Sequence, residues 1–225
     1  GRLLKEFNVR DPEDAVEAFC SVGAAFGIDS LRAPLLALRT ARVLAALAGR
    51  DHVVQDDLRA ASRLVLAPRA TRDELLAVHT AAHVDGFVAG TLGDEAMRRI
   101  GFPWSPELVE RTLRSCGGTL AAARAALREG GGVHLAGGTH HARADRGAGY
   151  CVFHDIAVAV RALQRESSVR RVLIVDTDVH QGDGTAAMLA DEPRAFTLSI
   201  HCRANFPARK QQSDLDVALD AEVGD

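Results

Sequence analysis

Two short clusters of polar side chains contain the residue types that activate water. They are Gly137-Gly138-Thr139-His140-His141 and Asp176-Thr177-Asp178-Val179-His180-Gln181-Gly182-Asp183-Gly184. One residue separates Asp178 from His180, so both side chains point to the same side of an extended segment. A carboxylate oxygen and an imidazole nitrogen placed together form half of a tetrahedral zinc site, with room for a third ligand and a water molecule.

The other polar residues of the clusters supply what a hydrolytic site needs beside a metal. His140 and His141 are candidate acid–base groups, and Asp176 and Asp183 are spare carboxylates. A histidine that acts as a general base usually donates its second ring nitrogen to a carboxylate, which fixes the tautomer and raises the basicity. The combination predicts catalysis of hydrolysis by an activated water.

Each feature also has a structural interpretation. Asp176 can cap a turn, a His-His pair can lie on the surface, and Gly182 and Gly184 can serve turn geometry alone. Two such clusters at strand ends of one sheet favour the functional interpretation. A structural role is favoured for the histidines without such neighbours, which are His79, His83, His134 and His201.

The elements that position these clusters are predicted strands and helices in alternation. Short apolar runs predict strands at 133–136, 171–176 and 196–200, the second of them covered on both faces. Helices are expected at 105–129, interrupted or kinked at Gly117-Gly118, and at 155–166. This order predicts an α/β fold with a parallel sheet, whose ligands bind at the carboxyl ends of the strands.

Residues 1 to about 70 show only helical patterns. Asp11-Pro12 is a helix start signal, a leucine-rich helix ends near Gly49, and another helix spans about 56–66. The chain is therefore expected to have a small all-α segment at 1–71 before the α/β domain at 72–225.

Composition excludes several other classes of protein. The chain has 225 residues, is 47% hydrophobic and carries a net charge of -3, which does not favour direct binding to nucleic acid or to anionic membranes. Its apolar runs are shorter than the roughly 20 residues of a membrane span, and no signal peptide opens it. The four cysteines lack zinc-knuckle spacing and indicate reduced thiols in the cytoplasm. The start at Gly1 without a methionine indicates a fragment.

Residues 72–225 resemble the zinc-dependent histone deacetylase family, which has the arginase-deacetylase fold. The resemblance lies in both clusters and in Gly149-Tyr150-Cys151-Val152-Phe153-His154-Asp155. Gln181, where large eukaryotic members usually have a second histidine, and the segment 99–106 are similar to the bacterial, acetoin-utilisation type and class IV branch. The resemblance implies a partial arginase-deacetylase sheet with flanking helices.

The resemblance also implies roles for individual residues. Asp178 and His180 would bind Zn²⁺, His141 with Asp183 would be the general base and acid, and His140 with Asp176 would give electrostatic support. The acyl-lysine tunnel would be lined by Gly149 and Tyr150, the latter in place of a phenylalanine. A structural K⁺ would be held by Asp176, Asp178, His180, Ser199 and Ile200. The implied reaction hydrolyses the N-acetyl amide of an acetylated lysine in a protein, or of a small acetyl amide, to amine and acetate.

Departures from the family pattern limit what this chain is expected to do. The third zinc ligand and the oxyanion-stabilising tyrosine of the family would fall beyond Asp225, so we expect residues 1–225 alone to be inactive. His154 stands in place of an asparagine, and His83 in place of a common tyrosine.

Residues 1–71 resemble the helical lid of a magnesium chelatase D-type AAA+ subunit. The segments 27–33 and 49–58 carry the resemblance to the lid, and the segment 65–72 resembles its end in the D-type subunit. Arg32 matches the nucleotide-sensing arginine of such lids. The phosphate loop G-x-x-x-x-G-K-[ST] is absent from the sequence. A generic helical bundle is the structural alternative. The alternative function of the chain is therefore a non-catalytic module that binds an AAA+ chelatase subunit.

Overall fold

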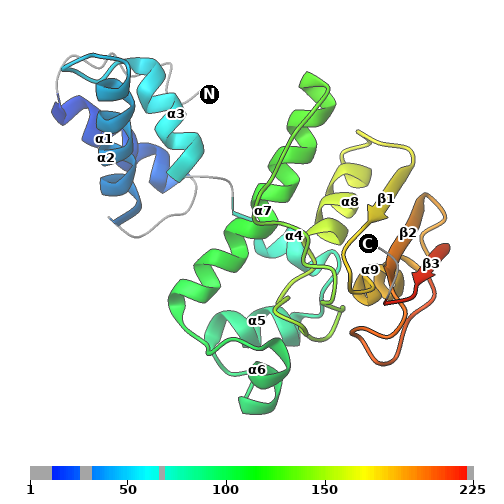
Figure 1. Ribbon diagram of the computed structural model, residues 1–225. Coiled ribbons are helices and arrows are strands. Elements are labelled where there is room, and N and C mark those ends of the chain that lie inside the picture. Colours follow the sequence, from blue (N-terminus) through cyan, green and yellow to red (C-terminus); the bar gives the residue numbers. More distant parts are fainter. Residues whose placement is uncertain (1–11, 26–31, 66–68, 222–225) are drawn as a thin grey trace. The chain divides into compact units, whose positions relative to one another are not determined.

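The computed structural model describes residues 12–25, 32–65 and 69–221, which form two compact units. The first unit comprises residues 1–68 and the second residues 69–225. Figure 1 shows the elements of each unit. Among the described residues, no helix has the length and apolar character needed to cross a membrane.

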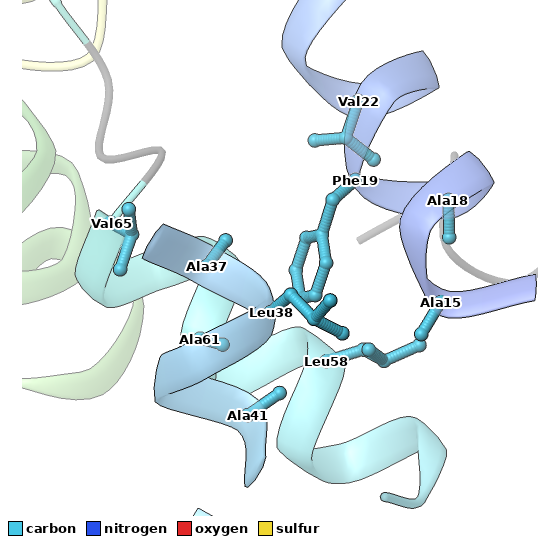
Figure 2. Packing of buried hydrophobic residues seen from close by; sticks show 10 residues of the cluster. All are labelled: Ala15, Ala18, Phe19, Val22, Ala37, Leu38, Ala41, Leu58, Ala61 and Val65. Atoms are coloured by element: carbon cyan, nitrogen blue, oxygen red, sulfur yellow. The ribbon is translucent and has the colours of Figure 1, made fainter. Parts of the chain in front are cut away.

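The described part of the first unit is helical, as predicted. It contains α1 (Pro12–Ala25), α2 (Arg32–Leu47) and α3 (Gln55–Val65). Phe19 and Leu58 are fully buried and pack among small alanine side chains of all three helices (Figure 2). Arg50, after α2, makes a two-pronged ion pair with Asp57 in the first turn of α3. This pair fixes the connection between the two helices.

The second unit begins with four helices. These are α4 (Arg72–Leu76), α5 (Ala81–Ala89), α6 (Asp94–Ile100) and α7 (Pro106–Glu129). Ser105 caps α7 through its hydroxyl, and Gly130 ends the helix in the left-handed conformation, as the sequence indicates. The predicted interruption at Gly117-Gly118 is wrong, because α7 runs through both glycines. His134 packs where a Cβ on Gly118 would lie, so the glycine serves close packing.

A parallel three-stranded sheet follows α8 (Asp155–Arg165). Its strands are β1 (Val172–Asp176), β2 (Ala195–Cys202) and β3 (Leu215–Leu219), in the order β1-β2-β3, and α9 (Asp183–Leu189) connects β1 to β2. Asp176 and Ser199 are cross-strand partners at the end of β1. The predicted α/β fold with a parallel sheet is confirmed.

Helices α8 and α9 cover one face of this sheet. Val160 of α8, Ile174 of β1 and Leu189 of α9 belong to one buried cluster. On β1 the alternate residues Leu173 and Val175 are more than half exposed, at 63% and 52%. The prediction that this strand is covered on both faces is therefore wrong within the described residues, where one face is covered.

The predicted strand at 133–136 is also wrong. The segment pairs with no strand in the described ranges, and Val133 and Leu135 are exposed. It is held instead by side chains, since His134 Nδ1 lies 2.9 Å from Thr119 Oγ1 of α7 and the Ser115 hydroxyl donates to the carbonyl of Ala136. An apolar run without a neighbouring strand has no ladder to join.

Candidate active site

The histidines of the first cluster meet the aspartates of the second in two buried pairs. His140 Nδ1 lies 2.6 Å from Asp176 Oδ2, and His141 Nδ1 lies 2.8 Å from Asp183 Oδ1. The two imidazole rings are neighbours, with centroids 4.1 Å apart. A carboxylate can only accept a hydrogen bond, so each imidazole donates from Nδ1 and exchanges protons at Nε2. The arrangement is that of two oriented acid–base groups.

The protonation of these pairs follows from burial and charge. Burial disfavours a charged His140, but the hydrogen bond to Asp176 outweighs it and raises the pKa of His140. Burial likewise opposes ionisation of Asp176 and Asp183, yet their histidine partners hold both carboxyl pKa values below the ordinary range. Both carboxylates are therefore ionised at neutral pH, the state in which they orient an imidazole.

Asp155, at the start of α8, holds the loop that carries both histidines. Its Oδ1 accepts hydrogen bonds from the backbone N–H and the hydroxyl of Thr139, at 2.8 and 2.6 Å. Its Oδ2 accepts from the backbone N–H of Gly138 at 2.9 Å and from the Thr119 hydroxyl at 2.5 Å. The sequence alone indicates no role for Asp155. The available signal was a charged residue at the first position of an apolar helix.

The same loop is seated on the N-terminal end of α9. The carbonyl of His140 accepts hydrogen bonds from the N–H groups of Gly184 and Thr185, at 2.9 and 3.2 Å. A Cβ on Gly184 would collide with the carbonyl oxygen of Ala142. Gly184 therefore serves the close approach of the two clusters, rather than a turn alone.

Asp178 and His180 lie in the loop between β1 and α9. Asp176 Oδ1 accepts from the Asp178 N–H at 3.0 Å, and Asp178 Oδ1 accepts from the His180 N–H at 2.8 Å. These two turns place Asp178 Oδ1 and His180 Nδ1 2.9 Å apart, with both side chains partly exposed. The His180 ring faces that of His141, at a centroid distance of 5.9 Å. The structure thus brings Asp178, His180 and His141 together.

This donor pair fits part of a zinc site. One carboxylate oxygen and one imidazole nitrogen, adjacent and accessible, are ligand types that Zn²⁺ accepts. Within residues 12–25, 32–65 and 69–221, no group of three or more His, Cys, Asp or Glu side chains is arranged to hold a metal ion. A third protein ligand is thus not supplied by the described residues.

The two predicted tunnel residues lie in a turn attached to the end of α6. The N–H groups of Gly149 and Tyr150 donate to the carbonyls of Arg99 and Ile100, at 3.2 and 2.7 Å. Gly149 has a φ of 54°, and a Cβ there would lie 2.7 Å from His141 Cδ2, so this position requires glycine. Tyr150 is exposed, and its ring packs against Phe102.

Phe206 lies beside the histidines, and no sequence motif predicts a role for it. Its ring is perpendicular to that of His141, with centroids 4.8 Å apart, and lies 6.1 Å from the His180 ring. The available signal was its position, in a polar loop just after the carboxyl end of β2. An aromatic side chain there forms an apolar wall next to the candidate acid–base group.

Two buried neutral histidines, His154 and His79, form hydrogen bonds with residues around the site. His154 Nδ1 accepts the N–H of Ala157, which leaves Nε2 to donate to the Thr185 hydroxyl over 3.0 Å. His79 Nε2 accepts the N–H of His154, and its Nδ1 donates to the carbonyl of Arg143. Burial lowers the pKa of His79 to about 3 and that of His154 to about 4. His154, which stands in place of the asparagine of the family, therefore caps α8 as a neutral side chain.

The remaining predicted histidines also have structural partners. His83 Nε2 lies 2.9 Å from the carbonyl of Val152, and His201 Nδ1 lies 3.0 Å from the Ser199 hydroxyl. The K⁺ site predicted around Asp176, Ser199 and Ile200 stays a prediction. So does the nucleotide-sensing role of Arg32, which begins α2 and whose side chain lies outside the described part of the structure.

Gln181 is fully buried and ties the loop that carries Phe206 to the β1–α9 loop. Its Nε2 donates to the carbonyl of Gln211 at 2.7 Å and to Asp216 Oδ1 at 2.9 Å, and its Oε1 accepts from the Gln211 N–H at 2.8 Å. The amide therefore pairs with a backbone peptide as a neighbouring strand would. A glutamine suits this position because it both donates and accepts.

Gln181→Glu is expected to destabilise the second unit by about 2 kcal/mol, because it removes both donated hydrogen bonds and places a carboxylate against Asp216. Urea denaturation measures the loss, and the exposed Gln212→Glu is the matched control with the same change of charge. Equal stability of the two variants would contradict the role of Gln181 in joining these two loops.

Comparison with known proteins identifies the family. The profile of the histone deacetylase domain matches residues 34–221. The chain belongs to this family. It is 49% identical over 148 residues to an uncharacterised protein of Picosynechococcus, a match that covers 66% of this chain and 49% of the relative.

Other relatives carry functional names. A probable deacetylase of Methanothermobacter thermautotrophicus is 34% identical over 167 residues, covering 68% of this chain and 47% of that protein. The acetoin utilization protein AcuC of Bacillus subtilis is 36% identical over 149 residues, covering 61% and 38%. The chain thus spans about half the length, or less, of these curated relatives.

A solved structure supports the fold. The crystal structure of an HDAC homolog from Aquifex aeolicus superposes with a TM-score of 0.57 at 24% identity, over 68% of this chain and 46% of that one. At this identity the likeness shows the fold alone. The family match begins inside α2, whereas the second compact unit begins at Arg69. The domain boundary at residue 72 and the chelatase-lid resemblance of residues 1–71 stay predictions.

Proposed function

We propose that this chain is part of a zinc-dependent deacetylase that hydrolyses N-acetyl-lysine amides in proteins to the free amine and acetate. The observation that carries the proposal is the convergence of two buried His–Asp pairs beside Asp178 and His180. The family match and the relatives named as deacetylases support it.

The residues of the site have different roles in the proposed reaction. Asp178 and His180 would hold the zinc ion. When bound, this ion would supply a Lewis acid for the acetyl carbonyl. His141, oriented by Asp183, takes a proton from the attacking water at Nε2 and returns it to the leaving amine. His140 bears positive charge more readily because of Asp176 and stabilises negative charge that develops on the carbonyl oxygen.

The apolar surroundings favour a long acyl-lysine chain. Phe206 stands perpendicular to His141, and a Cβ on Gly149 would lie 2.7 Å from His141 Cδ2 and 3.2 Å from Phe206 Cε1, so glycine leaves space beside both rings. Asp178 and His180 are the two zinc ligands proposed here, whereas a catalytic zinc site takes three protein ligands. We therefore assign turnover to a polypeptide that carries the whole family domain, and propose that residues 1–225 alone are inactive.

The test is hydrolysis of an acetyl-lysine peptide by the complete domain. We expect activity that is lost after dialysis against a chelator, returns with Zn²⁺ and is inhibited by a hydroxamate. An acetylated polyamine is the second substrate, and its preferential hydrolysis would assign the site to small amides instead. A zinc-loaded, folded protein that hydrolyses neither amide would contradict the proposal.

A further inference from the structure

Arg143 follows His141 by two residues and reaches the same aspartate. Its Nη2 donates to Asp183 Oδ2 over 2.8 Å, while Asp183 Oδ1 accepts from His141 Nδ1, also over 2.8 Å. The carboxylate therefore bridges a guanidinium and an imidazole. We propose that Arg143 is a positioning residue that fixes the Asp183 carboxylate and, through it, the plane of the His141 ring. The inference rests on the deacetylase function proposed above.

The two His–Asp pairs differ in what holds the second carboxylate oxygen. Asp176 Oδ1 accepts from the backbone N–H of Asp178, which the chain path fixes. Asp183 Oδ2 has a long side chain, that of Arg143, as its hydrogen-bond partner. The Asp183 side chain is only 10% exposed, so water cannot freely replace a lost donor. Without Arg143, Asp183 can turn about its side-chain bonds, and the His141 ring turns with it.

The main chain at Arg143 is held independently of its side chain. Its N–H donates to the carbonyl of Arg146 at 2.8 Å, and its carbonyl accepts from His79 Nδ1 at 2.9 Å. A substitution of the side chain therefore leaves the turn in place. Arg146, on the other side of this turn, forms an exposed ion pair with the adjacent Asp145. It is a matched control of the same residue type in the same loop.

The experiment compares Arg143→Gln, Arg143→Lys and Arg146→Gln. The first readout is the Nδ1–H resonance of His141 in the chain of 225 residues, assigned by its absence in His141→Ala. In Arg143→Gln we expect this proton to shift upfield and to exchange faster with water, because its acceptor is no longer fixed. Arg143→Lys, which keeps the charge and can still donate to Asp183, should shift this resonance less than Arg143→Gln does, and Arg146→Gln should leave it unchanged.

The second readout is turnover by the complete domain. We expect Arg143→Gln to lower kcat about tenfold with little change in KM, as for residues that orient an acid–base group. A merely structural ion pair would lower Tm while the resonance and kcat stay at wild-type values, and this result would overturn the proposal. If Arg143→Gln does not fold, Arg143→Lys provides the test. A small shift of the His141 Nδ1–H resonance in this variant would support the proposal, and an unchanged resonance would contradict it.

The two proposals can fail separately. Absence of hydrolysis by the wild-type domain would contradict the proposed function, and the His141 resonance would still test Arg143. Hydrolysis by the wild type together with an unchanged resonance in Arg143→Gln would leave the function standing and remove the positioning role.

Discussion

His141→Ala is expected to lower kcat for acetyl-lysine hydrolysis by about a thousandfold, within the range of a lost general acid–base group. Its Nδ1 is occupied by Asp183, so proton transfer can take place at Nε2. Alanine removes the proton acceptor and leaves Asp183 and Arg143 in place. The measurement is single-turnover hydrolysis of an acetyl-lysine peptide by the complete domain with saturating zinc.

The control for this variant is another His–Asp pair of the chain. His52 and Asp51 are in contact at 2.8 Å, as His141 and Asp183 are, but both side chains are largely exposed. We expect His52→Ala to keep wild-type activity. A smaller loss is expected for His140→Ala, whose ring provides charge stabilisation. A larger loss in His140→Ala than in His141→Ala would contradict the division of roles and exchange the two histidines.

The second cluster was predictable because Asp176, Asp178 and His180 lie at or just after the end of β1, whereas the first cluster follows no strand in the described ranges. The alternation of Asp178 and His180 and the position of Asp176 at the end of β1 follow from the chain alone. The pairing of His140 with Asp176 joins residues 36 positions apart in the sequence, so the local pattern does not show which aspartate contacts each histidine. These pairs are expected from the family resemblance.

The supporting residues were not predictable in the same way. Arg143 and Asp155 act on groups 40 and 16 positions away, and the place of Asp155 at the start of an apolar helix does not indicate its partners. Phe206 contacts His141 from a loop that follows another strand. Such contacts are set by which loops the parallel sheet places at its carboxyl edge, a tertiary property that local periodicity does not record.

The wrong predictions about strands have a common physical cause: the apolar pattern of a segment does not show which neighbours it has in the folded sheet. The runs at 133–136 and 171–176 are both apolar, but only the second has a neighbouring strand to bond. The strand β3 was missed although Leu215, Val217 and Leu219 alternate with Asp216 and Ala218. Its side chains are mostly exposed, so the segment lacks the continuous apolar run expected of a buried parallel strand.

Asp155→Ala is expected to destabilise the second unit by about 4 kcal/mol, because it leaves several buried donors without an acceptor. The carboxylate accepts from two backbone N–H groups and two hydroxyls, and Asp155 itself is fully buried. Denaturant unfolding measures the loss. The exposed Asp145→Ala, which removes only an ion pair with the neighbouring Arg146, should cost less than about 0.5 kcal/mol.

The pH dependence gives the Asp155 prediction a second, independent test. Burial alone would raise the pKa of Asp155, but hydrogen bonds from Thr119 and Thr139 outweigh it and lower the pKa below its ordinary value. A carboxyl group with a lowered folded-state pKa stabilises the fold above its unfolded pKa, about 3.9, and this stabilisation is lost as the pH falls through the folded value. The stability difference between wild type and Asp155→Asn should therefore be constant near neutral pH and shrink below about pH 4. A difference that stays constant down to pH values where the wild type unfolds would mean that the Asp155 charge does not hold the histidine loop.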